Sequence, residues 1–299
     1  MQELAPDVIL CGGYNYLASW QAQRWAQQNH VRFLLWSEST GADQRSESKI
    51  IESLKRKFFA KCDGFVVPGT SAQAYVRQIE ASTKPVFIAP NAVDSQRFAA
   101  NAELARADAS RTRAKLGLPR RYFLFVGRLV KSKGILELIE AYGSLSDKLR
   151  SEVGLVFAGD GPLRSELEFQ SRLISPGVVR FPGFVHRDEL ASYYALADCL
   201  VFPTRSDPWG LVVNEAMACG VPIICSEIAG CAADLIKANG LTTAPRDVQQ
   251  LARAMEELAK DASLREEMSL RSRQLISNYS PDQCASGIAK AAISGYRAR

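Results

Sequence analysis

Residues 122–134 read YFLFVGRLVKSKG, and this stretch decides the fold. Its first five residues are all apolar, which is typical of a β-strand. A glycine ends the run, and a helical pattern follows near Ile135–Tyr142. A strand, a glycine turn and a helix in this order open a βαβ unit, so the stretch predicts a parallel sheet.

The alternation of strand and helix continues toward the C-terminus. Four more apolar runs, GLVFAG, VVRFPGF, CLVFP and VPIIC, stand at residues 154–159, 178–184, 199–203 and 221–225. Helical patterns separate them, so the five runs predict a doubly wound sheet whose ligands bind where the carboxyl ends of the strands meet. The tail from residue 248 is expected to be helical, with a helix start at Ser280-Pro281.

A second, less regular set of strands precedes this sheet. Short apolar runs alternate with helical patterns at residues 8–10, 31–36, 64–69 and 85–90, which predicts another parallel α/β domain. From Arg97 to Arg120 the chain is rich in Ala and Arg and has no strand signal. We therefore place the domain boundary in this stretch.

Composition excludes several classes of protein. The 299 residues are 47% hydrophobic and 23% charged, as in an ordinary globular protein of about two domains. The sequence shows neither a run of about 18 apolar residues nor a signal-peptide pattern, so we expect a cytoplasmic protein. The seven cysteines include no CxxC pair and are expected to be small buried hydrophobes. The net charge of +5 comes from cations interleaved with acids, so we expect no nucleic-acid partner.

One stretch is both basic and amphipathic. Residues 55–61 carry four Lys and Arg side chains around Phe58 and Phe59. Such a helix can lie on an anionic bilayer. A helix whose charged face is simply solvated is the favoured alternative, and both interpretations stay open.

The turn after the run YFLFV carries cations. Gly127 and Arg128 follow the strand, and Lys133 stands just before the expected helix. Because a helix N-terminus is positive and Arg and Lys grip phosphate, this turn is a candidate anion site. A solvated basic loop is the alternative.

Two carboxylates follow the run CLVFP. Asp207 precedes Pro208, a pair that is typical of the N-cap and first residue of a helix. Glu215 lies within the apolar stretch 210–219, where an unpartnered carboxylate is costly. Glu215 is therefore expected to meet a bound hydroxyl or an internal cation, and a structural pair with Lys or Arg is the competing account.

These motifs together resemble a known family. The order GRLVKSKG, FAGDGPLRSEL, FPGFV, PTRSDPWGLVVNEAMACGVPII and AGCAADLI is similar to the nucleotide-sugar-binding half of family 4 glycosyltransferases, from about Tyr122 to Lys260. PNAVDSQRF at residues 90–98 resembles the end of that family's acceptor domain. The resemblance implies an α/β chain of GT-B fold, with two Rossmann-like doubly wound domains.

The resemblance also implies three parts of the chain. Residues 1–115 form the N-terminal, acceptor-side domain, which is expected to be shortened and incomplete because the similarity begins at PDVILCGGYN. Residues 116–275 form the donor-binding domain. Residues 276–299 form a C-terminal helix that is expected to pack back toward the N-terminal domain.

The resemblance implies how the diphosphate and ribose of the donor are bound. Arg128 and Lys133, with Gly127 in the same turn, match the residues that hold the diphosphate and stabilise charge on the leaving group without a metal. Glu215 matches the second acid of the family's acid-x7-acid motif, which accepts hydrogen bonds from the ribose hydroxyls. No cofactor is expected, because the UDP- or GDP-linked sugar is the substrate.

The donor sugar and base are assigned in the same way. Asp207 matches the first acid, beside the sugar ring, although the family usually has Glu there. Backbone amides near Gly210 and Leu211 are expected to face the sugar or phosphate, and the loop near Val185 to line the base. The family often has a histidine after a strand like VRFLLW, and Glu38 stands near that place. Glu38 is a candidate for the catalytic face, with capping of the next segment as the alternative.

The leading hypothesis is a retaining enzyme that moves a hexose-type sugar to an acceptor hydroxyl. The expected acceptor is a glycan or a lipid-linked molecule of cell-envelope polysaccharide, lipopolysaccharide or glycoconjugate biosynthesis, met in the cytoplasm or at the inner face of the membrane. Two alternatives stay open: a sugar-nucleotide epimerase of the same fold, and a non-catalytic nucleotide-binding remnant. His30 and His186 form no triad with a nucleophile, so hydrolase chemistry is not predicted.

Overall fold

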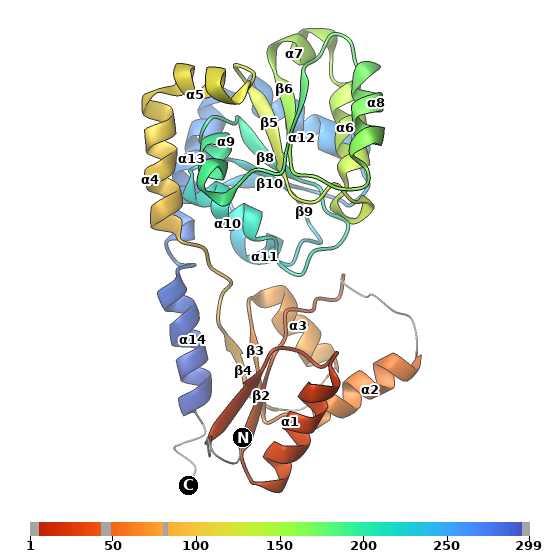
Figure 1. The fold of residues 1–299 in the computed structure, drawn as a ribbon, viewed down its shortest axis with the longest axis vertical. Helices are drawn as coiled ribbons and strands as arrows, with labels where there is room; N and C mark the ends of the chain where they lie inside the picture. The colour runs from red at the N-terminus through yellow and green to blue at the C-terminus, as the bar shows by residue number, and fades with distance from the viewer. Residues whose placement is uncertain (1–5, 43–48, 80–82, 295–299) are drawn as a thin grey trace. The chain divides into compact units, whose positions relative to one another are not determined.

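The computed structural model describes residues 6–42, 49–79 and 83–294. The chain divides into two compact units, one of Met1–Asn91 with Ser280–Arg299 and one of Ala92–Tyr279. Each unit is a parallel sheet with helices on both faces (Figure 1). The prediction of two parallel α/β domains is confirmed.

The second unit contains the doubly wound sheet that the sequence predicts. Its strands are β5 (Tyr122–Val126), β6 (Gly154–Ala158), β7 (Val179–Gly183), β8 (Cys199–Phe202), β9 (Ile223–Ser226) and β10 (Gly240–Thr243). They are all parallel and lie in the order β10-β9-β8-β5-β6-β7, so the direction of winding switches between β5 and β8. The sequence analysis missed β10, because GLTT has a single large apolar residue and no strand pattern.

Helices cover both faces of this sheet. They are α4 (Ser95–Ala107), α5 (Ala109–Leu116), α6 (Ile135–Ser144), α7 (Asp147–Glu152), α8 (Arg164–Arg172), α9 (Arg187–Ala195), α10 (Leu211–Ala218), α11 (Ala232–Leu235), α12 (Val248–Lys260) and α13 (Ala262–Ile276). Successive side chains of β5 point to opposite faces, as the pleat requires. Phe123 packs with residues of α6 and α12, and Leu124 with residues of α4, α9 and α10.

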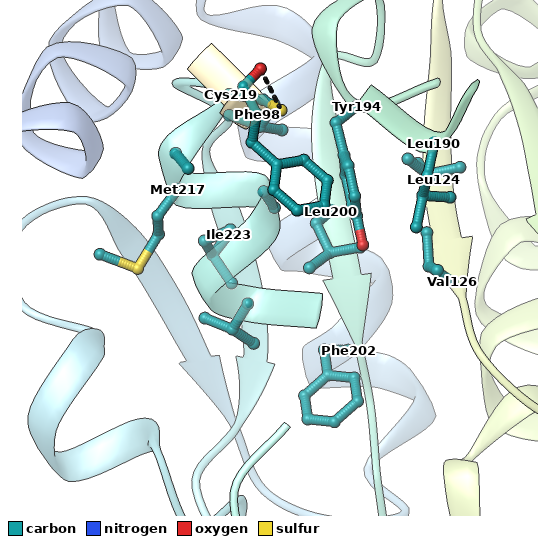
Figure 2. Close-up of a cluster of buried hydrophobic side chains, with 14 of the residues drawn as sticks. Phe98, Leu124, Val126, Leu190, Tyr194, Leu200, Phe202, Met217, Cys219 and Ile223 are labelled. Atoms are coloured by element: carbon teal, nitrogen blue, oxygen red, sulfur yellow. Dashed lines mark hydrogen bonds between the residues drawn. The ribbon is translucent and has the colours of Figure 1, made fainter. Parts of the chain in front are cut away.

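Helix α4 is part of the second unit. Figure 2 shows Phe98 of α4 beside Tyr194 of α9, with ring centroids 6.3 Å apart, and the thiol of Cys219 directed at the Phe98 carbonyl. The sequence analysis assigned residues 92–115 to the first domain, whereas the structure places them in the second unit. The reason is that α4 buries its apolar side against α9 and α10.

The first unit has a simpler sheet. Its described strands β1 (Val8–Cys11), β2 (Arg32–Trp36), β3 (Gly64–Val67) and β4 (Val86–Ile88) are parallel and follow one another in chain order. Right-handed crossovers then put the connecting helices on a single face. These helices are α1 (Leu17–Gln28), α2 (Lys49–Ala60) and α3 (Thr70–Ile79).

The C-terminal helix α14 (Pro281–Ile293) covers the other face of this sheet (Figure 1). It begins where the sequence predicts, because the backbone N–H of Gln283 donates to Ser280 Oγ and Pro281 stands at the first helical position. Near its end the Arg32 guanidinium donates to the Ala291 carbonyl over 2.8 Å. Residues distant in sequence therefore complete the first unit.

Both aromatic residues and one cation of the basic stretch at residues 55–61 are buried within the unit, whereas its other three cations are exposed. Phe58 and Phe59 are completely buried, and Lys55 donates to the Tyr75 hydroxyl over 2.6 Å. Neither aromatic ring is available to a bilayer, so Phe58 and Phe59 do not support the membrane interpretation, which stays a prediction. Among the described residues, no helix is long and apolar enough to cross a membrane. Five cysteines are buried as expected: Cys62, Cys199, Cys219, Cys225 and Cys231.

The packing of α14 leads to a prediction about two helical glycines. A Cβ on Gly287 would lie 2.3 Å from the Ile88 carbonyl oxygen, whereas one on Gly143 of α6 would make only an ordinary 3.4 Å contact with Ile174. We expect Gly287→Ala to lower the free energy of unfolding of its unit by about 1–3 kcal/mol. The control Gly143→Ala should be neutral or raise it by up to about 1 kcal/mol. Urea unfolding followed by circular dichroism measures both, and equal effects would contradict this packing.

Candidate functional site

The candidate site lies at the carboxyl edge of the second sheet. The turn after β5 and the loop after β8 are neighbours there, because β5 and β8 pair side by side at the switch point. Such a switch point is where doubly wound sheets bind their ligands. The sequence-predicted residues of both motifs are thus brought together.

The turn after β5 is held by the loop after β6. The Leu129 backbone N–H donates to the Asp160 carbonyl, and the Leu163 N–H donates to the Leu129 carbonyl, over 2.9 and 3.1 Å. Both bonds are made by Leu129 and fix the backbone directly after Arg128. The Arg128 side chain itself is exposed and forms no ion pair or hydrogen bond with any residue of the described ranges. Its guanidinium is therefore free to meet an anion.

Lys133 ends the short 3-10 helix η1 (Lys131–Lys133) and is three-quarters buried. Its ammonium forms an ion pair with Asp207 Oδ2 and lies 5.8 Å from the centre of the Phe202 ring. The first predicted carboxylate and the second predicted cation are thus direct partners. The pair fixes the position of the Lys133 ammonium at the switch point, and Asp207 balances its charge.

The η1 turn packs directly on the end of β8. The Ser132 carbonyl accepts from the Arg205 backbone N–H over 2.8 Å and from Thr204 Oγ1 over 3.0 Å. Gly134 has φ +68°, and a Cβ there would lie 1.9 Å from the Pro203 carbonyl oxygen. Only glycine combines this backbone conformation with so close an approach.

Asp207 does not cap helix α10. The helix begins at Leu211 after Gly210, whereas Asp207 Oδ1 accepts from the Trp209 backbone N–H over 3.3 Å in a local turn. The interpretation of Asp207-Pro208 as an N-cap pair is therefore wrong. The sequence alone did not show that the carboxylate has a stronger partner in Lys133.

Gly210 and Leu211 stand at the positive end of α10. Gly210 has φ +100°, and a Cβ there would lie 2.6 Å from the Phe202 ring, so this tight entry into the helix requires glycine. Leu211 is 44% exposed although it is apolar. The first turn of α10 carries no acidic side chain, which leaves its positive end available to an anion.

Glu215 lies in α10 and is mostly buried. The Tyr194 hydroxyl donates to Glu215 Oε2 over 2.8 Å. Burial raises the pKa of Glu215, and the Tyr194 hydrogen bond and the charge of Arg187 offset part of the rise. Its partner within the chain is thus a phenol and not the Lys or Arg of the competing account. Among the described residues, none donates a hydrogen bond to Oε1.

Val185 follows β7, is half-buried and packs against the cluster shown in Figure 2. Glu38 belongs to the first unit, where its Oε1 accepts from the Trp36 indole N–H over 3.0 Å. Its proposed place on a catalytic face stays a prediction. The described ranges contain no group of three or more His, Cys, Asp or Glu side chains that could hold a metal ion.

Three residues of this neighbourhood were missed by the sequence analysis. Tyr194 partners Glu215, and Arg205 binds Glu137 with its side chain. Arg205 stands two residues before Asp207 in the motif PTRSDPWG, and this position was the one sequence signal that could have marked it as a site residue. The other two residues lie on helices, where pairing depends on tertiary packing.

Comparison with known proteins identifies the family. The family model described as glycosyl transferases group 1 matches residues 108–275, which is more than half of the chain and lies within the second unit. The chain belongs to this family.

Two curated relatives of this chain differ in how much of their length they share with it. TuaC of Bacillus subtilis (strain 168), named for teichuronic acid biosynthesis, is 35% identical over 170 residues, which is 56% of this chain and 40% of TuaC. The D-inositol 3-phosphate glycosyltransferase of Salinispora arenicola is 29% identical over 298 residues, which is 93% of this chain and 65% of that enzyme. The chain therefore spans less than two thirds of the length of either relative.

A solved structure shows the same fold. HepE of Anabaena, determined in complex with UDP, has a TM-score of 0.79 and 20% identity, and the match covers 95% of this chain and 78% of HepE. At this identity the similarity shows the fold alone. The chain has the two parallel α/β units of the GT-B fold, as the resemblance implied.

The raised pKa of Glu215 leads to a prediction about stability. A carboxyl group whose pKa is higher in the folded chain favours folding less as the pH rises above its unfolded pKa. We therefore expect Glu215→Gln to be more stable than the wild type at pH 7. The difference should shrink below about pH 4, where the Glu215 carboxyl is mostly protonated in both the folded and the unfolded chain. Urea unfolding at both pH values measures this. Glu140→Gln removes an exposed carboxylate as the control, and a pH-independent loss of stability in Glu215→Gln would contradict the account.

Proposed function

We propose that the chain is a retaining glycosyltransferase that moves a hexose-type sugar from a UDP- or GDP-linked donor to an acceptor hydroxyl. The observation that carries this proposal is the pair of cations at the β5–β8 switch point. Arg128 has an unpaired side chain, and Lys133 is held beside Asp207. Family membership supports a nucleoside diphosphate sugar as the anion that this site receives.

The diphosphate of the donor lies between the turn after β5 and the start of α10. The planar guanidinium of Arg128 binds the diphosphate through two hydrogen bonds, and the Lys133 ammonium adds a localised positive charge. Breaking the bond from the sugar to the diphosphate leaves negative charge on the phosphate, and fixed cations stabilise that charge as it develops. This electrostatic role needs no metal ion.

Groups next to the two cations bind the nucleoside and the sugar of the donor. Glu215 Oε1, which has no donor within the described part of the chain, accepts from the ribose hydroxyls. Asp207 lies beside the donor sugar, and backbone N–H groups at Gly210 and Leu211 face the sugar or phosphate. The loop at Val185 lines the base.

The acceptor is proposed to be a cell-envelope glycan or a glycoconjugate precursor. Support comes from the names of relatives, which concern teichuronic acid biosynthesis for TuaC and an O-antigen chain for a mannosyltransferase of Escherichia coli. Glu38 is proposed for the catalytic face on the acceptor side. Transfer is proposed to occur in the cytoplasm, and any contact with the membrane uses side chains other than Phe58 and Phe59.

Product analysis tests the proposed reaction. The purified chain is incubated with UDP- and GDP-linked hexoses, with and without glycan and lipid-linked acceptors. We expect an acceptor product with the anomeric configuration of the donor. An isomerised donor formed without acceptor would favour an epimerase instead. Donor binding without transfer to any acceptor would favour a non-catalytic protein.

Binding of free nucleoside diphosphate tests the two cations. We expect Arg128→Ala and Lys133→Ala each to weaken UDP or GDP binding roughly 10- to 100-fold, since each removes a charge-assisted hydrogen bond of about 1.5–3 kcal/mol. Arg253→Ala, which removes an exposed arginine from α12, is the control and should bind as the wild type does. If the calorimetric dissociation constants are unchanged in both site variants, Arg128 and Lys133 do not bind the diphosphate.

A further inference from the structure

Two ion pairs join the segments that flank β5 and β8, one at each end of these strands. At the carboxyl ends, Arg205 follows β8 and pairs with Glu137, which lies beyond the turn after β5. At the amino ends, Arg121 precedes β5 and pairs with Asp198, which precedes β8. The two pairs thus bridge the same strands from opposite edges of the sheet, and the first lies at the candidate site.

The Arg205–Glu137 pair is short and largely enclosed. Arg205 Nε donates to Glu137 Oε1 over 2.5 Å, and a second guanidinium nitrogen contacts the same oxygen. Glu137 is 7% exposed, and its Oε2 is buried without a partner within the described ranges. A buried ion pair that leaves one oxygen unsatisfied adds little to stability, because desolvation offsets the attraction. Its larger effect is to fix the positions of the two segments.

The fixed segment is the one that carries Lys133. The Arg205 backbone N–H binds the Ser132 carbonyl, and the Arg205 side chain binds Glu137 in the first turn of α6. Lys133 lies between these two attachment points. A single residue of the β8 loop therefore holds both sides of the turn from which the lysine extends.

We propose that Arg205 and Glu137 are positioning residues that fix the η1 turn, so that the Lys133 ammonium faces the diphosphate of the donor. This inference rests on the proposed function and adds two residues to it. Neither side chain is assigned a contact with the donor, since Arg205 and Glu137 bind each other. The effect passes through the backbone of residues 131–134 to Lys133.

The Arg121–Asp198 pair is a matched control. The exposed fractions of the side chains are 28% and 12% in this pair and 28% and 9% in Arg205–Glu137. Arg121 Nε donates to Asp198 Oδ2 over 2.8 Å. Breaking either pair removes a similar interaction from the same unit, but only one pair adjoins Lys133. A purely structural role would make the two losses equivalent.

The test compares Glu137→Gln with Asp198→Asn in the full chain. UDP and GDP are titrated separately by calorimetry, and thermal unfolding reports stability. We expect Glu137→Gln to weaken binding of the diphosphate about tenfold while Asp198→Asn leaves it within twofold, at similar losses of thermal stability. Arg205→Lys keeps the charge but not the two-nitrogen contact, and should fall between Glu137→Gln and the wild type. Equal affinities for Glu137→Gln and Asp198→Asn would overturn the proposal.

A double-mutant cycle shows whether the effect passes through Lys133. In a Lys133→Ala background the positioned ammonium is absent, so Glu137→Gln should cause no further loss of affinity. An undiminished tenfold loss there would overturn the positioning role.

The same data separate this inference from the proposed function. If Arg128→Ala and Lys133→Ala both bind UDP and GDP as well as the wild type does, or neither nucleotide binds the wild type, the donor site itself is refuted and the inference with it. If Arg128→Ala weakens binding and Lys133→Ala does not, the positioning role is refuted and the donor site is not. If Lys133→Ala weakens binding and Glu137→Gln does not, only the positioning role is refuted.

Discussion

The close packing of the η1 turn on the end of β8 is the constraint on which the site depends. Gly134 brings the backbone of the turn against the Pro203 carbonyl, and the Ser132 carbonyl takes two hydrogen bonds from the β8 loop. Because these contacts involve backbone atoms, the turn cannot shift without breaking several of them together. Lys133 and Asp207 therefore meet through the geometry of two neighbouring strands.

This constraint follows from the winding of the second sheet. The direction of winding reverses between β5 and β8, and the carboxyl edge at such a switch point is where doubly wound sheets bind their ligands. The family match lies within the same unit, at residues 108–275. The chemistry proposed for the donor is thus contained in one compact unit, while Glu38 belongs to the other.

Several elements could be predicted from sequence because their signals are local. The run YFLFV is buried on both faces, and its apolar character alone predicted β5. Gly127, Arg128 and Lys133 lie within one short turn, so their grouping needed no tertiary information. β10 was missed because GLTT has no apolar pattern, and residues 92–115 were misassigned because an Ala-rich helix and a linker look alike in sequence. The pairs Arg205–Glu137 and Tyr194–Glu215 join residues 68 and 21 positions apart, and only the folded sheet brings such residues together.

The most direct measurement is calorimetric titration of the intact wild-type chain with UDP and with GDP, in the presence of a metal chelator. The central claim is that the β5–β8 edge binds a nucleoside diphosphate with protein cations alone. The account predicts saturable binding of at least one of the two nucleotides, at one molecule per chain and unchanged when magnesium replaces the chelator. Absence of binding to both nucleotides under both conditions would contradict it.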